Sequence, residues 1–166
     1  MRKIFTILIL IVGLCAHAQE KINGCYLRMV EPEVSDTLEA TNGVVKVYID
    51  FDSGAYFANL AIENLTDDVI EIDWDKFLML GDKSSKEIIF DDTVMALANN
   101  PKGTTSIAPH TKLRKAIAPK DNVEYGTKLF QKKYAKLRPE KVGFLIPVVR
   151  NGETTFFQCV VEAYVK

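Results

Sequence analysis

The sequence has no apolar run long enough to cross a membrane and no excess of positive charge. Its longest apolar stretch, residues 4–14, has about 11 residues, whereas a membrane-spanning helix needs roughly 20. The 22 acidic residues slightly outnumber the 21 basic ones, and this balance gives no general attraction to polyanions. We therefore expect neither a transmembrane span nor a nucleic-acid partner.

The first 18 residues have the features of a cleaved export signal. Arg2 and Lys3 precede the apolar stretch, and Ala16-His17-Ala18 places small residues at positions −3 and −1 of a signal peptidase site. We expect the mature protein to begin at Gln19, to form a single domain over residues 19–166, and to reside in the periplasm or at the cell surface. Cys15 raises a lipoprotein alternative, which Leu14 disfavours because a small residue is expected before a lipidated cysteine.

Few residues are available for catalysis or metal binding once the signal is removed. His110 is then the only histidine, so a histidine-rich zinc site is excluded. Serine catalysis would depend on His110 alone, and the Gly-x-Ser-x-Gly turn is absent. No Cys-x-x-Cys pair and no glycine-rich phosphate loop is present. We expect His110 to be a solvated loop residue, and we expect no metal and no cofactor.

Two cysteines remain in the mature chain, Cys25 near its start and Cys159 near its end. Both lie on apolar faces of alternating segments, and disulfides persist in exported proteins. A Cys25–Cys159 bridge between the first and the last strand is therefore a candidate. Two buried free thiols are the alternative, since free cysteine is among the most buried residue types.

Apolar and polar residues alternate along most of the mature chain, and a period of two is typical of half-buried β-strands. The turn-forming stretch 64–68 should join the two strands on either side of it into a pair. Asn151-Gly152 lies between two alternating runs, which is a strong hairpin signal. Pro147 should lie at an edge or a bulge, since proline cannot donate to a ladder. The expected strands cover residues 25–30, 45–51, 58–62, 70–74, 87–90, 112–118, 142–148 and 155–163.

Only residues 127–137 indicate a helix, because Phe130, Tyr134 and Leu137 recur at helical spacing and Pro139 follows. We expect one or two helical turns that pack against the sheet. The same region is strongly basic, and it is either a docking surface for an anionic partner or a solubilising face. The candidate docking residues are Lys128, Lys132, Lys133, Lys136, Arg138 and Lys141.

About eight short strands predict an all-β fold, a two-sheet antiparallel sandwich, with a barrel as the main competitor. The patterns Asn64-x-Thr66, Ile70-x-Ile72-x-Trp74, Phe77-x-Met79 and Ser106-Ile107-Ala108-Pro109 extend this prediction. In these residues the chain resembles the immunoglobulin-like modules of exported bacterial envelope proteins of the Bacteroidetes type. The resemblance implies an immunoglobulin-like sandwich and no catalytic residues.

Acidic residues are concentrated in one half of the chain. Residues 31–92 carry 16 acids and 4 bases, and residues 93–166 carry 5 acids and 13 bases. We expect the two halves to interleave, so that their charges partly neutralise each other. The pairs Asp50/Asp52 and Asp73/Asp75 are expected on solvated strand faces, with a calcium site or a hydrolase as the alternatives.

Exposed aromatic rings could stack against sugars. Tyr48 and Tyr56 are the candidates, whereas Trp74 is expected in the core because it continues the apolar positions 70 and 72. The composition and motifs together predict a non-enzymatic binding or structural module of the bacterial cell envelope that contacts a protein or a glycan. The alternatives are a carbohydrate-binding module and a carboxylate-based hydrolase.

Overall fold

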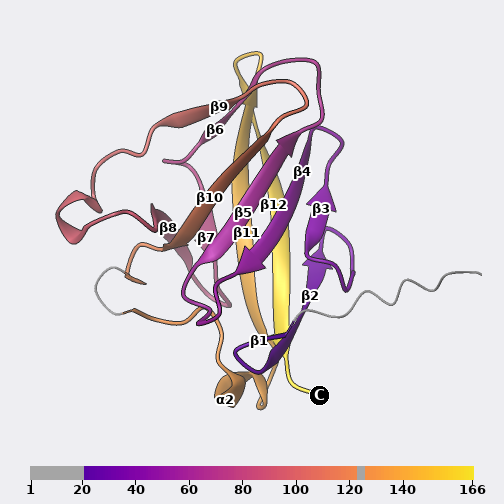
Figure 1. The fold of residues 1–166 in the computed structure, drawn as a ribbon, viewed down its shortest axis with the longest axis vertical. Coiled ribbons are helices and arrows are strands. Elements are labelled where there is room, and N and C mark those ends of the chain that lie inside the picture. The colour runs from indigo at the N-terminus through magenta and orange to yellow at the C-terminus, as the bar shows by residue number, and fades with distance from the viewer. Residues whose placement is uncertain (1–20, 123–125) are drawn as a thin grey trace, which may run out of the picture.

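The computed structural model describes residues 21–122 and 126–166, so the expected export signal, its cleavage site and Cys15 lie outside the described residues. The described chain is an antiparallel all-β fold whose twelve strands form one curled sheet (Figure 1). The strands are β1 (Lys21–Ile22), β2 (Cys25–Glu31), β3 (Glu39–Thr41), β4 (Val45–Phe51), β5 (Ala58–Asn64), β6 (Ile70–Asp73), β7 (Leu78–Leu80), β8 (Ser85–Phe90), β9 (Thr104–Ile107), β10 (Lys112–Pro119), β11 (Glu140–Arg150) and β12 (Glu153–Tyr164).

All eight expected strands are present, and the described residues add four short ones, β1, β3, β7 and β9. The sheet is also continuous, whereas two separate sheets were expected. Strand β8 makes the connection, because residues 85–87 pair with β7 and residues 88–90 pair with β10. This junction gives the strand order β1-β2-β12-β11-β7-β8-β10-β5-β4-β3. Outside this order, β6 pairs with β11, and β9 pairs with β6.

The two halves of the curled sheet enclose the main apolar core. Strands β4, β5 and β10 lie in front of β11 and β12 in the view of Figure 1. The core residues come from both halves, and Phe51 of β4 reaches Phe144 of β11 with ring centroids 6.5 Å apart. Phe51 also makes an edge contact with Phe130 at 5.0 Å. The period-two alternation therefore places the apolar side chains of each half against the other half.

The final hairpin forms as its sequence predicts. Asn151 and Gly152 both have positive φ, 52° and 81°, and Arg150 pairs with Glu153 across the two-residue turn. Pro147 lies where the outer side of β11 changes partner, because residues 143–145 pair with β7 and residues 148–149 pair with β6. No bulge occurs at Pro147 in the β11–β12 ladder, and β11 is an interior strand. Pro147 instead lies at a local edge, where the outer side of β11 has no strand partner among the described residues.

The expected pairing of residues 58–62 with residues 70–74 is wrong. Strand β5 pairs with β4 and β10, while β6 pairs with β11 and β9. The stretch 64–68 therefore carries the chain from one half of the sheet to the other. Two strands joined by a short turn usually pair, but here the turn residues have contacts of their own that hold a corner.

A single helical turn, α2 (Lys132–Ala135), lies inside the expected range 127–137. The buried side chains around it belong to Phe130 and Ala135, whereas Tyr134 is exposed and Leu137 is 84% exposed. The expected apolar face through positions 130, 134 and 137 is therefore wrong. One turn is too short for side chains seven residues apart to share a face.

Ion pairs join the acidic half of the sequence to the basic half. Glu63 of β5 pairs with Lys112 of β10 at 3.3 Å, and Glu87 pairs with Lys120. Asp68 pairs with Arg150 at 2.6 Å and Asp82 with Arg138 at 2.7 Å. Each of these contacts joins two segments that are distant in the sequence and adjacent in the fold. The halves thus interleave, as expected.

Candidate functional site

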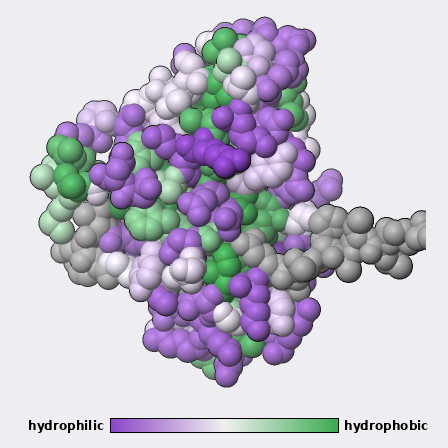
Figure 2. Space-filling view, in the orientation of Figure 1, coloured by the Kyte–Doolittle hydropathy of each residue, from purple (hydrophilic) through white to green (hydrophobic). Residues whose placement is uncertain are grey.

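The segment 91–103, between β8 and β9, leaves the sheet and carries the 3₁₀ turn η1 (Met95–Leu97). Three large apolar side chains of this segment are exposed: Val94 by 57%, Met95 by 61% and Leu97 by 54%. Figure 2 shows the resulting apolar surface at the left edge of the molecule. The segment projects from the body of the domain there in Figure 1, so these side chains face solvent rather than the core.

The base of this segment is fixed by hydrogen bonds. The carboxylate of Asp75 accepts the backbone N–H groups of Lys102 at 2.7 Å and Gly103 at 3.0 Å. These N–H groups, Lys102 first, hold the pKa of Asp75 below its ordinary value. The N–H of Trp74 donates to the carbonyl of Gly103 at 3.0 Å. Ala98 of the segment is buried against Ile89 and Ala118, which attaches η1 to the body of the domain.

Trp74 itself is in the core, as expected, with 1% of its surface exposed. Its indole stacks on Phe77 at a centroid distance of 5.6 Å and meets Phe90 edge-on at 5.3 Å. The indole N–H donates to Thr105 Oγ1 at 2.9 Å, which satisfies its polar atom. The ring therefore supports the base of segment 91–103 from below and is not a platform for a ligand.

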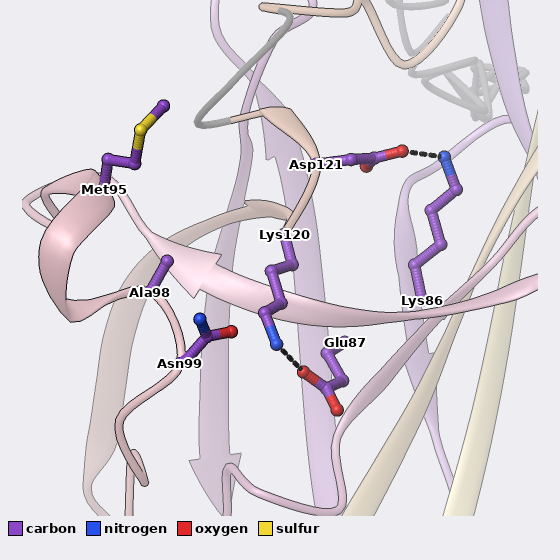
Figure 3. A pocket seen from close by; sticks show the side chains of 7 residues that line it. All are labelled: Lys86, Glu87, Met95, Ala98, Asn99, Lys120 and Asp121. Atoms are coloured by element: carbon purple, nitrogen blue, oxygen red, sulfur yellow. Dashed lines mark hydrogen bonds and ion pairs between the residues drawn. The ribbon is translucent and has the colours of Figure 1, made fainter.

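An open pocket of about 610 Å³ lies between η1 and the opposite wall formed by β8 and the end of β10. Met95, Ala98 and Asn99 line one side (Figure 3). On the other side Lys86 pairs with Asp121 at 2.6 Å and Lys120 pairs with Glu87. The hydrogen bond from Lys120 lowers the pKa of Glu87. Both carboxylates thus have cationic partners, and the pKa of Glu87 shifts away from the range of a general acid.

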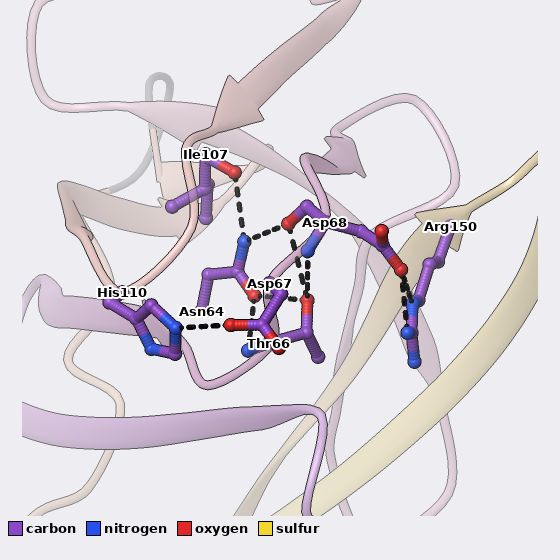
Figure 4. A network of polar contacts seen from close by, with 7 residues as sticks. All are labelled: Asn64, Thr66, Asp67, Asp68, Ile107, His110 and Arg150. Atoms are coloured by element: carbon purple, nitrogen blue, oxygen red, sulfur yellow. Dashed lines mark hydrogen bonds and ion pairs between the residues drawn. The ribbon is translucent and has the colours of Figure 1, made fainter.

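A second polar cluster lies at the corner between β5 and β6 (Figure 4). The side chain of Asn64 is fully buried. Its amide N–H₂ donates to the carbonyls of Asp68 at 2.7 Å and Ile107 at 3.0 Å, and its Oδ1 accepts the N–H and O–H of Thr66 at 2.9 and 2.8 Å. The Asn64-x-Thr66 pattern is thus a structural device that holds the corner.

His110 lies in an exposed loop beside this corner, with Nε2 2.9 Å from Asp67 Oδ1 (Figure 4). Asp67 is almost fully exposed as well. The pair is solvated, and no serine or cysteine of the described residues contacts it. This placement agrees with the expectation of a solvated loop residue.

The candidate disulfide is absent, because Cys25 and Cys159 are both buried free cysteines. The bridge would have joined the first and last expected strands, and these two strands are neighbours, since β2 pairs with β12. The register separates the thiols: Tyr26 pairs with Tyr164, so Cys25 lies beside position 165, six residues from Cys159. At about 3.3 Å per residue the two are about 20 Å apart along the strand. Burial raises the pKa of Cys159 to about 12.

The six basic candidates lie on and around α2 and at the start of β11, at the lower end of the molecule in Figure 1. Arg138 is engaged with Asp82, and the Lys128 ammonium lies 3.4 Å from Asn23 Oδ1. Lys133 contacts the ring of Tyr134. Lys132, Lys136 and Lys141 are exposed. The region remains a candidate surface for an anionic partner, but part of its charge is already paired.

Both tyrosine candidates are in contact with lysine ammonium groups. Lys112 Nζ lies 4.1 Å and Lys46 Nζ 4.7 Å from the centre of the Tyr48 ring, and the Tyr48 hydroxyl donates to Glu63. Lys128 Nζ lies 5.3 Å from the centre of the Tyr56 ring. A sugar that stacked on these rings would compete with the cation contacts.

The paired aspartates serve local structure. Asp52 accepts three backbone N–H groups of its own turn, from Gly54, Tyr56 and Phe57. Asp73 pairs with Lys76 at 2.8 Å. Over residues 21–122 and 126–166 no group of three or more histidine, cysteine, aspartate or glutamate side chains could hold a metal ion.

No helix within the described ranges is both long and apolar enough to span a bilayer. No family model matches the chain, and neither the curated proteins nor the solved structures include a significant match. The candidate site is therefore identified from the geometry of the structure alone.

Sequence reasoning did not identify segment 91–103. Its apolar residues have no strand or helix period, and they stand between Asp91-Asp92 and Asn99-Asn100-Pro101. The sequence did contain one indication of this site: large apolar side chains within a stretch that otherwise has the composition of a loop.

Proposed function

We propose that the chain is an exported, non-enzymatic binding module of a bacterial cell envelope, and that segment 91–103 contacts a protein partner. The observation that carries this proposal is the exposure of Val94, Met95 and Leu97 within four residues. Single exposed apolar residues are ordinary, but a contiguous group next to a pocket is typical of an interaction site. Loops held by a rigid scaffold commonly carry binding residues.

The arrangement of the segment suits a protein interface. Its base is held by Asp75 and supported by Trp74, so the tip is presented in a defined position. The adjoining pocket has an apolar wall from Met95 and Ala98 and a charged wall of ion pairs. An apolar centre with a polar rim is the usual composition of such interfaces. A partner side chain could enter the pocket beside Met95.

The non-enzymatic part of the proposal is supported by the hydrogen-bond and ion-pair partners of the carboxylates in and near the pocket, and by the lowered pKa of two of them. Glu87 and Asp121 in the pocket are paired with lysines, and Asp75 accepts backbone N–H groups. The pKa values of Glu87 and Asp75 are lowered, whereas an acid catalyst needs a raised pKa. These contacts fix structure and leave no free acid–base pair in the pocket.

We further propose that the two halves of the curled sheet correspond to the two layers of an immunoglobulin-like sandwich. The core between β4 and β11 supports this assignment. The location in the periplasm or at the cell surface is supported by the sequence of residues 1–18. Mass spectrometry of the protein from the producing bacterium should find Gln19 as its first residue; retention of residues 1–18 would contradict export through cleavage.

The interface is tested by site-specific photo-crosslinking in the producing bacterium. Met95 is replaced by photoreactive p-benzoylphenylalanine, and Leu137, which is 84% exposed next to α2, is replaced in the control. A discrete covalent adduct with another protein is expected from position 95 and not from position 137. No adduct at position 95, or the same adducts at both positions, would overturn the proposal.

A further inference from the structure

A second hollow lies on the outer face of the other half of the sheet, over strands β4, β5 and β10. Its volume is about 650 Å³, within the range of small-ligand sites. The register aligns Tyr48, Ala61 and Arg114 in one row across the three strands, and Asp50, Asn59 and Ala116 in the next. Directly paired residues point to the same face of a sheet, so these six side chains share the solvent side.

The hollow exists because of two alanines. Ala61 and Ala116 each have a single methyl group, whereas their neighbours in the two rows are long or polar. Tyr48 and Arg114 stand on either side of Ala61 in the first row. In the second row Asn59 and Asp91 are the neighbours of Ala116, and Asp50 lies beyond Asn59. The alanines thus form a floor, and the longer side chains form walls around it.

The polar groups around the hollow have hydrogen-bonding capacity that the protein does not use. Among the described residues, the side chains of Asn59, Asp91 and Arg114 make no hydrogen bond and no ion pair. Asp50 uses one oxygen, Oδ1, to accept the N–H of Phe51. The adjoining row is different, because Glu63 there contacts both Lys112 and Tyr48. On this face of β4, β5 and β10 the unpaired polar side chains therefore lie at the hollow, whereas the adjoining row is paired.

The chemistry of these groups selects a neutral, hydroxyl-rich ligand. Asp50 and Asp91 accept hydrogen bonds, Arg114 donates them, and Asn59 does both. Two carboxylates and one cation, Arg114, line the hollow, whereas Lys115 pairs with the buried Leu60 and its ammonium lies over the Phe90 ring. This lining gives no preference for an anion such as a nucleic acid. Apart from Tyr48 the exposed lining lacks large apolar side chains, which distinguishes it from the centre of a protein interface.

We propose that this hollow binds a neutral glycan through Asp50, Asn59 and Arg114, with Asp91 at its edge. Sugar hydroxyl groups both donate and accept, and they would pair with the carboxylates, the amide and the guanidinium at once. The groups stand on paired strands, so little ordering is needed when the ligand binds. This site lies outside segment 91–103 except for Asp91, and it does not depend on the protein interface proposed there.

The test uses an array of neutral glucan, mannan, galactan and xylan oligosaccharides, printed beside acidic glycans, with the chain from Gln19 onward. Binding to at least one neutral glycan is expected, and it should persist in 0.5 M salt because charge does not drive it. No binding to any neutral glycan would overturn the proposal. Binding restricted to acidic glycans and lost in salt would also overturn it and would indicate the basic residues around α2.

Variants then locate the site. Asn59→Ala and Arg114→Met should each weaken binding of the same printed glycan by about tenfold or more, since each removes hydrogen bonds to the ligand. Lys83→Met removes an exposed cation between β7 and β8 and serves as the matched control, which should bind like the wild type. Unchanged binding in both site variants would contradict the proposed position. Far-ultraviolet circular dichroism confirms that each variant is folded.

Discussion

Two regions of the molecule differ in which side chains they expose to solvent. At the corner between β5 and β6, the buried amide of Asn64 uses its donor and acceptor atoms within the protein (Figure 4). In segment 91–103, polar contacts hold only the base, and Val94, Met95 and Leu97 face outward (Figure 3 shows Met95 at the rim of the pocket). The corner has no capacity left for a ligand, whereas the tip has apolar surface without a described role in the fold.

The difference separates residues that maintain the fold from residues that are available for binding. A buried polar side chain with all its hydrogen bonds made is costly to remove. Exposed apolar side chains contribute little to stability, because they stay in water in both states. Substitutions should therefore have large effects at the corner and at the base of the segment, and almost none at its tip.

The largest effect is expected below the base of the segment. Trp74→Ala removes a fully buried indole and its contacts with Phe77 and Phe90. We expect a loss of about 3–5 kcal/mol in the free energy of unfolding, the usual cost of such a cavity. Urea unfolding followed by circular dichroism measures the loss. Tryptophan fluorescence cannot be used, because Trp74 is the only tryptophan of the chain and this variant lacks it. A loss below about 1 kcal/mol would show that the base is not part of the core.

The second largest loss of stability is expected at the corner between β5 and β6. Asn64→Ala leaves the carbonyls of Asp68 and Ile107 without the donor they have now. We expect a loss of about 2–3 kcal/mol, because the buried carbonyl of Ile107 loses this partner and the Asp68 carbonyl keeps only its bond from Thr66 Oγ1. Urea unfolding followed by Trp74 fluorescence measures it. Asn59→Ala, an exposed asparagine on the same strand β5, is the control and should stay within about 0.5 kcal/mol of the wild type.

Substitution of Asp75, which anchors the base of segment 91–103, should change hydrogen exchange only near that base. In Asp75→Ala the N–H groups of Lys102 and Gly103 lose their acceptor. Hydrogen exchange of these two amides should become faster, while the amides of β11 and β12 should be unchanged. Equal protection of Lys102 and Gly103 in both proteins would contradict the role of Asp75.

The same anchor predicts a pH dependence. The pKa of Asp75 is lowered from 3.8 in the folded protein, so its carboxylate contributes stability above the unfolded pKa, and this contribution is lost as the pH falls through the lower, folded value. The exchange of the Lys102 and Gly103 amides should therefore differ between wild type and Asp75→Ala at pH 6, and this difference should shrink at a pH below 3. A difference that stayed constant over this range would contradict the carboxylate as the acceptor.

Much of the fold follows from local pattern. The alternation of apolar and polar residues predicted all eight expected strands. Asn151-Gly152 predicted the hairpin because asparagine and glycine adopt the positive φ that its turn requires. The strands that were missed, such as β3 and β7, have three residues each. A period of two cannot be recognised over so short a length.

The pairing of strands and the site were harder to predict because they depend on distant contacts. The turn at 64–68 carries a corner rather than a hairpin because Asn64 bonds to Ile107, 43 residues away. The thiols of Cys25 and Cys159 stay apart because of register, which sequence alone did not fix. In the same way, the hollow over Ala61 and Ala116 exists only once β5 and β10 are paired.

The smallest expected effect tests the central claim, that the apolar tip of segment 91–103 is kept for a partner and not for the fold. The measurement is the free energy of unfolding of the triple variant V94S/M95S/L97S by urea titration with Trp74 fluorescence. We predict a value within about 0.5 kcal/mol of the wild type, as for other exposed positions. A loss of about 2 kcal/mol or more would contradict the account, because it would place these side chains in the folded core.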